Sequence, residues 1–106
     1  MHDFVSRWQI TEMSEWDQDY VNLVEPGYFL FTNDNLGEFV FGAVQGWVDA
    51  RVSSREPFLE YSWQGVNEGD EVCGRGWFRF PNPDTGEGML FIHNGDESSI
   101  VICRET

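Results

Sequence analysis

The chain has 106 residues, enough for one domain, residues 1–106, with a single hydrophobic core. Nineteen acidic residues stand against six basic ones, all of them arginine, which gives a formal net charge of −13 at pH 7. Such a charge repels phosphate backbones and anionic membranes, so it argues against direct nucleic-acid or membrane binding. A basic protein partner fits this charge.

The N-terminal residues lack the basic start and long apolar run of a secretory signal, and no stretch approaches the ~20 apolar residues that span a bilayer. We therefore expect a cytoplasmic protein. In that compartment Cys73 and Cys103 are expected to be reduced. A disulfide between them is the alternative, and it would indicate an oxidising location.

A helix is predicted after the first strand. Ser14 and Asp17 have the spacing of a capping box, in which each side chain bonds the backbone of the other. Apolar side chains follow at helical spacing, at Trp16, Tyr20, Leu23 and Val24. The pattern predicts one amphipathic helix over residues 15–24, which the pair Pro26-Gly27 ends.

Short segments with the composition of strands, separated by turn residues, make up most of the chain. The expected strands are residues 7–12, 28–32, 38–45, 47–53, 58–64, 72–80, 88–93 and 99–104. Short connections favour an antiparallel meander, because parallel strands need long crossovers. The predicted fold class is mainly β, with about eight strands curled into a small barrel or half-barrel and the helix packed against it. The alternative is an α+β fold, an open antiparallel sheet backed by the helix.

Three connections predict how the central strands pair. They are a two-residue turn at Gln45-Gly46, the loop SSREP at residues 53–57, and a two-residue turn at Glu68-Gly69. The resulting pairs are Gly42 with Asp49, Arg51 with Glu60, Asp49 with Ser62, Ser62 with Arg75, and Glu60 with Trp77. The three turns together describe one consistent sheet.

Strand alternation assigns these residues to two faces. The predicted core face carries Phe39, Phe41, Ala43, Val48, Ala50, Val52, Leu59, Tyr61, Trp63 and Phe78. The opposite face carries Trp47, Asp49, Arg51, Glu60, Ser62, Gln64, Cys73, Arg75 and Trp77. This second face gathers polar and charged side chains between two tryptophans.

Seven residues of the polar face form the candidate ligand-binding site: Trp47, Asp49, Arg51, Glu60, Ser62, Arg75 and Trp77. One interpretation is a solvated face, whose paired charges stabilise the fold by a few tenths of a kcal/mol each. The other is a recessed pocket, in which arginine forks hold a small anionic or polar ligand and the indoles form walls. In that case Arg51, Glu60 and Arg75 should form one coupled network.

Catalysis and metal binding are weaker alternatives. Asp49 and Glu60 could divide acid and base roles, but no activated nucleophile stands beside a recognisable base, so binding is favoured over catalysis. Cys73, His93 and Cys103 could be proposed as zinc ligands, and one strand register brings Cys73 opposite His93. The chain has no C-x-x-C or H-x-x-x-H pair and no obvious fourth ligand, so we expect no metal and no cofactor.

Three motifs resemble those of a family of small uncharacterised bacterial proteins. They are FGAVQGWVDAR at residues 41–51, EYSWQGVNEGDEVCGRGW at residues 60–77, and LFIHNGDES at residues 90–98. The resemblance covers nearly the whole chain and is compatible with an origin on a mobile, integron-type gene cassette. It implies no activity. Cys73 stands where the family usually has serine, so the resemblance implies no nucleophilic role for this thiol.

Two functions from different classes follow. The first is a non-catalytic small-ligand-binding β domain that uses the polar face. The second is an acidic protein-interaction module that docks a basic partner or acts as a nucleic-acid mimic. Because 17 aromatic residues exceed what one short helix could cover, we also expect a homodimer.

Overall fold

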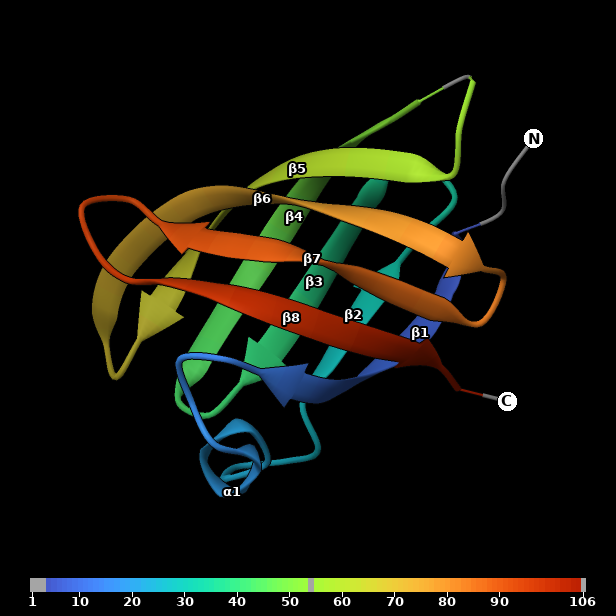
Figure 1. Cartoon of the computed structure of the whole chain (residues 1–106). Coiled ribbons are helices and arrows are strands. Elements are labelled where there is room, and N and C mark those ends of the chain that lie inside the picture. Colours follow the sequence, from blue (N-terminus) through green and yellow to red (C-terminus); the bar gives the residue numbers. More distant parts are fainter. Residues whose placement is uncertain (1–3, 54, 106) are drawn as a thin grey trace.

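The computed structural model describes residues 4–53 and 55–105, and within them eight antiparallel strands close into a barrel (Figure 1). In chain order these strands are β1 Ser6–Met13, β2 Tyr28–Phe31, β3 Leu36–Phe41, β4 Val44–Val52, β5 Phe58–Asn67, β6 Asp70–Asn82, β7 Thr85–Ile92 and β8 Glu97–Arg104. Each strand pairs with its neighbours in sequence, and β8 pairs with β1. The mainly β, antiparallel barrel prediction is confirmed. Because the barrel is closed, each described strand pairs with a neighbour on both sides.

Aromatic side chains fill the barrel interior. Trp8, Phe29, Phe39, Phe41 and Phe78 are all essentially fully buried. Phe29 lies among other rings: its centroid is 4.8 Å from that of Phe39 and 5.1 Å from that of Phe78. Eight strands enclose a space that side chains can just fill, and this core fills it with rings. The strand alternation read from the sequence therefore has its physical basis in the packing of these rings.

The helix is much shorter than predicted. Helix α1 spans Gln18–Val21, instead of residues 15–24, and lies at one end of the barrel (Figure 1). Its N-cap is Asp17, whose carboxylate accepts a hydrogen bond from the backbone N–H of Tyr20 at 2.9 Å. The predicted capping box was therefore wrong, since Asp17 itself caps the helix.

Ser14 has a different role from the predicted cap. Its hydroxyl accepts a hydrogen bond from the backbone N–H of Ser99 at 3.0 Å, and the N–H of Glu15 donates to the hydroxyl of Ser98 at 3.1 Å. These bonds hold the segment after β1 against β8 in a non-helical conformation. Beyond the helix, Leu23 and Val24 are 64% and 69% exposed, so they do not form the apolar helix face that the sequence suggested.

The β3–β4 turn also differs from the prediction. It lies at Gly42 and Ala43, not at Gln45-Gly46, and Phe41 pairs with Val44. Gly42 has φ +56°, a conformation that glycine adopts readily. Gly46 instead lies within β4, where a Cβ atom would clash with the ring of Phe39. The tertiary contact with this ring decides which glycine turns the chain.

The consequences for the predicted faces are small. Leu36, not Gly42, lies opposite Asp49, but the register moves by an even number of residues, so the faces keep their assignment. Ala43 belongs to the turn and is half-buried, and Val52 is 40% exposed. These two residues do not belong to the core. The other predicted core residues are buried.

The registers of β4, β5 and β6 agree with the prediction. Arg51 lies opposite Glu60, and Ser62 lies opposite Asp49 on one side and Arg75 on the other. The SSREP loop includes residue 54, which lies outside the described residues. The β5–β6 turn has positive φ at Glu68 and Gly69, as a two-residue hairpin turn of this kind requires.

Removing the central ring of the core should be costly. We expect Phe29→Ala to lower the free energy of unfolding by about 3–5 kcal/mol, because it leaves a cavity between rings that cannot collapse fully. Leu23→Ala, at an exposed position, is the control and should cost less than about 0.5 kcal/mol. Urea titration of both variants measures the difference. A loss below about 1 kcal/mol for Phe29→Ala would contradict this account of the core.

Candidate ligand-binding site

The seven predicted site residues lie on the outer face of the barrel, on adjacent strands β4, β5 and β6. This face is open to solvent: the indole of Trp47 is 48% exposed, and the side chains of Asp49 and Arg51 are 52% and 72% exposed. The structure therefore brings the seven together on one face, but Asp49, Arg51 and Glu60 are solvated instead of recessed.

The charged residues of this face pair differently from the expectation. Arg51 Nη1 donates to Asp49 Oδ1 at 2.9 Å, although Glu60 lies directly opposite Arg51. Within the described residues, Glu60 forms no ion pair with Arg51 or Arg75. The structure thus shows one exposed ion pair in place of the expected network, and such pairs stabilise a fold by less than about 1 kcal/mol.

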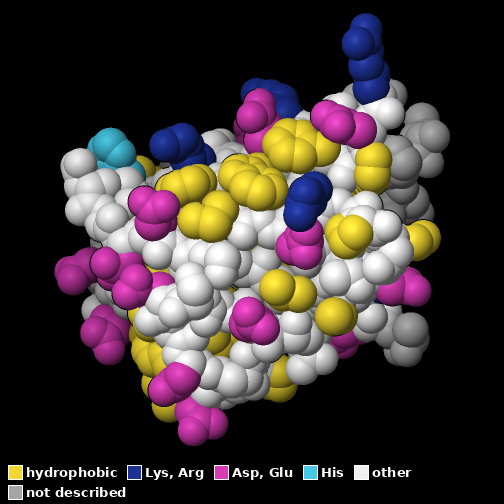
Figure 2. All heavy atoms as spheres, in the orientation of Figure 1, with side chains coloured by type: hydrophobic (Ala, Val, Ile, Leu, Met, Phe, Trp, Pro, Cys, Tyr) yellow, Lys and Arg dark blue, Asp and Glu magenta, His cyan; other side chains and the backbone are white. Residues whose placement is uncertain are grey.

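Aromatic rings line this face in larger number than the sequence indicated. Trp77 stacks on Phe58, with ring centroids 6.0 Å apart and planes 25° apart. The guanidinium of Arg75 lies over the ring of Phe91, 4.8 Å from its centroid. Figure 2 shows an apolar patch on the side of the molecule that β5, β6 and β7 form, with both basic and acidic side chains around it. Phe58 and Phe91 were not predicted as site residues.

Two adjoining hollows lie on this outer face. The first has a volume of about 510 Å³, and Ser62, Arg75, Phe91, His93, Asp96 and Glu97 are among its lining residues. The second has a volume of about 530 Å³, and Trp47, Gln64, Glu71, Val72, Cys73 and His93 line it. Cys73 and His93 line both hollows, which we call together the outer groove.

The outer groove divides the predicted residues into two groups. Trp47, Ser62 and Arg75 line it, whereas the other four predicted residues do not: Asp49, Arg51, Glu60 and Trp77. Sequence reasoning missed Phe91 and Glu97, because it left the register of β7 and β8 open. Had that register been known, Phe91 opposite Arg75 and Glu97 opposite Phe91 would have joined the site.

The proposed zinc residues come together only in part. Cys73 does lie opposite His93, whose backbone N–H donates to the carbonyl of Cys73 at 2.7 Å. Cys103 lies on β8, with its sulfur 4.0 Å from the hydroxyl of Thr11, and both cysteines are free thiols. In the part of the chain that the structure describes, no group of three or more His, Cys, Asp or Glu side chains could hold a metal ion.

Comparison of the chain with family models, curated proteins and solved structures found no significant match. The resemblance to small bacterial proteins therefore stays a prediction that depends on the three motifs. Among the described residues, no helix has the length and apolar character needed to cross a membrane.

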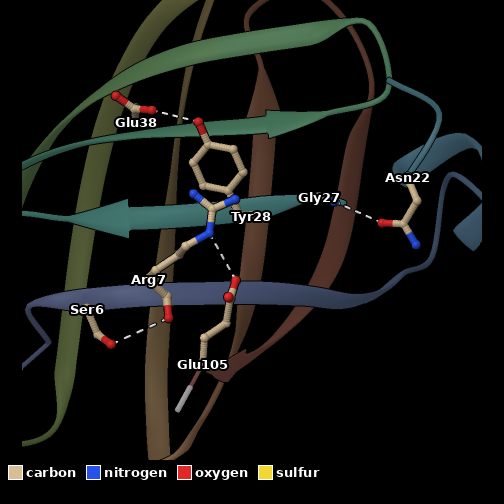
Figure 3. Close-up of polar contacts among 7 residues, drawn as sticks. All are labelled: Ser6, Arg7, Asn22, Gly27, Tyr28, Glu38 and Glu105. Atoms are coloured by element: carbon tan, nitrogen blue, oxygen red, sulfur yellow. Dashed lines mark hydrogen bonds and ion pairs between the residues drawn. The ribbon is translucent and has the colours of Figure 1, made fainter. Parts of the chain in front are cut away.

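A second polar cluster, which was not predicted, lies on β1, β2 and β3 (Figure 3). The hydroxyl of Tyr28 donates to Glu38 Oε2 at 2.6 Å. The guanidinium of Arg7 lies over the Tyr28 ring, 3.8 Å from its centroid, and Arg7 Nε donates to Glu105 Oε2 at 3.1 Å. These contacts join three strands and the C-terminal segment, which indicates a structural role.

The surroundings of Tyr28 raise the pKa of its phenol to about 12. The largest cause is burial, followed by the hydrogen bond to Glu38 and the negative charges of Glu38 and Glu25. Arg7 acts in the opposite direction and lowers this pKa. Burial likewise raises the pKa of Tyr61 well above its ordinary value.

The raised pKa of Tyr28 predicts how stability depends on alkaline pH. An unfolded tyrosine loses its proton near pH 10, whereas folded Tyr28 keeps it to about pH 12. The unfolded state therefore binds fewer protons in this window, so the contribution of Tyr28 to the free energy of unfolding should be constant below pH 10 and fall as the pH rises toward 12. Because the chain has no lysine, no ammonium group of that type titrates in the same range.

Tyr28→Phe removes this contribution, and the fall in stability above pH 10 should become shallower. Urea titrations of the wild type and the variant at a series of alkaline pH values measure the two slopes. The raised pKa of Tyr61 acts in both proteins and cancels in the comparison. Equal slopes would show that Tyr28 does not hold its proton as described.

Proposed function

We propose that this protein is a non-catalytic β-barrel that binds a small ligand in the outer groove. The proposal depends on the contacts that the guanidinium of Arg75 makes. Within the described residues no carboxylate lies within ion-pairing distance of its guanidinium, which contacts the ring of Phe91 at the groove. A guanidinium presents a planar fork of donors that matches a carboxylate, and here that fork is available to a ligand.

The surroundings of Arg75 support this proposal. Arg51 and Arg79, on the same side of the barrel, each pair with an acid, namely Asp49 and Glu87. The exposed indole of Trp47 lines the adjoining hollow and supplies an apolar wall. Ligand sites commonly combine apolar and aromatic surface with a few polar groups that fix orientation.

Catalysis by Asp49 and Glu60 has less support. Asp49 already accepts a hydrogen bond from Arg51, and Glu60 is exposed and lies outside the lining of the outer groove. A general acid or base must reach the proton that it transfers. We therefore propose binding without catalysis and without a cofactor.

Benzoate, which joins a carboxylate to a flat apolar ring, is a suitable first probe. We expect millimolar benzoate to shift the amide resonances of the groove residues in a saturable way. Arg75→Gln should weaken this binding by about tenfold or more, because it removes the charged fork. The matched control is Arg79→Gln, whose guanidinium pairs with Glu87, and it should bind as the wild type does. The absence of a saturable shift in the wild type would count against the proposal.

A second candidate function is the docking of a basic partner protein, including action as a nucleic-acid mimic. Between Arg7 and Arg51 the chain has no lysine or arginine, and this segment contains helix α1. Next to the helix the apolar side chains of Leu23 and Val24 are 64% and 69% exposed. A complex based on surface charge should weaken steeply with added salt, whereas binding of a small ligand in the outer groove should change little.

We also propose that the protein is a homodimer. The exposed apolar side chains of Leu23 and Val24 are among those that self-association could cover. Light scattering at micromolar concentration should give twice the chain mass of 12.3 kDa. A single species of the chain mass would refute this proposal.

We also propose a cytoplasmic location, because the two free thiols fit a reducing compartment.

A further inference from the structure

We infer that the ligand of the outer groove is a zwitterion of the α-amino-acid type, an inference that rests on the ligand-binding function proposed above. Arg75 on β6, Phe91 on β7 and Glu97 on β8 form one row across three strands, because Arg75 pairs with Phe91 and Phe91 pairs with Glu97. All three residues line the first hollow. The row thus presents a cation, an aromatic ring and an anion in order.

The two charges of this row have no ionic partner in the part of the chain that the structure describes. Across residues 4–53 and 55–105, neither Arg75 nor Glu97 forms an ion pair, with the other or with any other residue. Two strand spacings separate their backbones by about 10 Å. Opposite charges that share a hollow at this separation can both be satisfied by a ligand that carries a carboxylate and an ammonium group. Asp96 adds a second acid to the lining at the Glu97 end.

The ring between the charges adds a third contact. The guanidinium of Arg75 lies 4.8 Å from the centroid of Phe91, so a carboxylate held by Arg75 would lie close to that ring. The ring face also attracts an ammonium group. An apolar side chain of the ligand would extend toward the second hollow, which Trp47 and Val72 line. Each part of an apolar amino acid therefore has a complementary surface.

The net charge of the protein distinguishes this ligand from simpler ions. A protein of net charge −13 repels a free anion, even where one arginine attracts it locally. A free cation would be attracted to the whole acidic surface and would not select the groove. A zwitterion has no net charge, so it avoids the long-range repulsion and still uses both local charges. The outer groove thus favours a zwitterion over either ion.

L-leucine, N-acetyl-L-leucine and L-leucine amide test the inference, because the second lacks the ammonium charge and the third lacks the carboxylate. Amide chemical-shift titration at neutral pH gives the affinity of each. We expect leucine to bind at least about tenfold more tightly than either analogue. Glu97→Gln should remove the preference for leucine over N-acetyl-L-leucine, and Arg75→Gln should remove the preference over leucine amide.

Glu68→Gln is the matched control for Glu97→Gln. It removes one negative charge from the exposed β5–β6 turn, outside the groove lining, and should leave both preferences unchanged. If N-acetyl-L-leucine binds as tightly as leucine and Arg75→Gln weakens both, the zwitterion is overturned while the ligand-binding function stands. If neither these three compounds nor benzoate gives a saturable shift, both proposals are overturned.

Discussion

The filling of the barrel interior by aromatic rings is the constraint on which the rest of the structure depends. Trp8, Phe29, Phe39, Phe41 and Phe78 occupy the space that eight closed strands enclose. Barrels of this size either fill with side chains or keep room for one small ligand, and in the described residues of this one aromatic rings pack together in the interior. The ligand binding that we propose therefore uses the outer surface, where every second residue of each strand points.

Basic residues are scarce on that outer surface, so it is informative whether a given arginine has an acidic partner. Most acids can remain solvated, because nothing requires nineteen carboxylates to find six guanidinium partners. An arginine on a strand without an acidic partner is harder to explain in such a surplus, since the other arginines of the described strands all pair with an acid. Arg51 and Arg79 each pair with an acid, whereas Arg75 contacts the ring of Phe91. Within the described residues, the groove therefore differs from its surroundings in having an arginine that forms no ion pair.

The sequence was sufficient where one local feature determined the structure, and insufficient where distant contacts did. The local Glu68-Gly69 turn was enough to predict that Ser62 pairs with Arg75. The β3–β4 turn offered two glycines, and tertiary packing decides between them, because the ring of Phe39 packs against Gly46 and the ring of Tyr20 packs against Gly42. The helix was overpredicted because bonds from β8 hold the segment at Ser14. Two of the three residues of the row, Phe91 and Glu97, were missed for the same reason: the registers of β7 and β8 depend on contacts far along the chain.

The core and the outer groove are connected through β6, whose sequence alternates glycine with large side chains. Gly76 faces inward, and a Cβ atom there would clash with the hydroxyl of Tyr61 and with the carbonyl of Met89. Its absence lets the Tyr61 ring cross β6 from the neighbouring strand and donate a hydrogen bond to Met89 O at 3.1 Å. Because this bond joins β5 to β7, it holds β7 in the register that sets Phe91 opposite Arg75. A buried tyrosine thus aligns two residues that meet on the opposite side of the sheet.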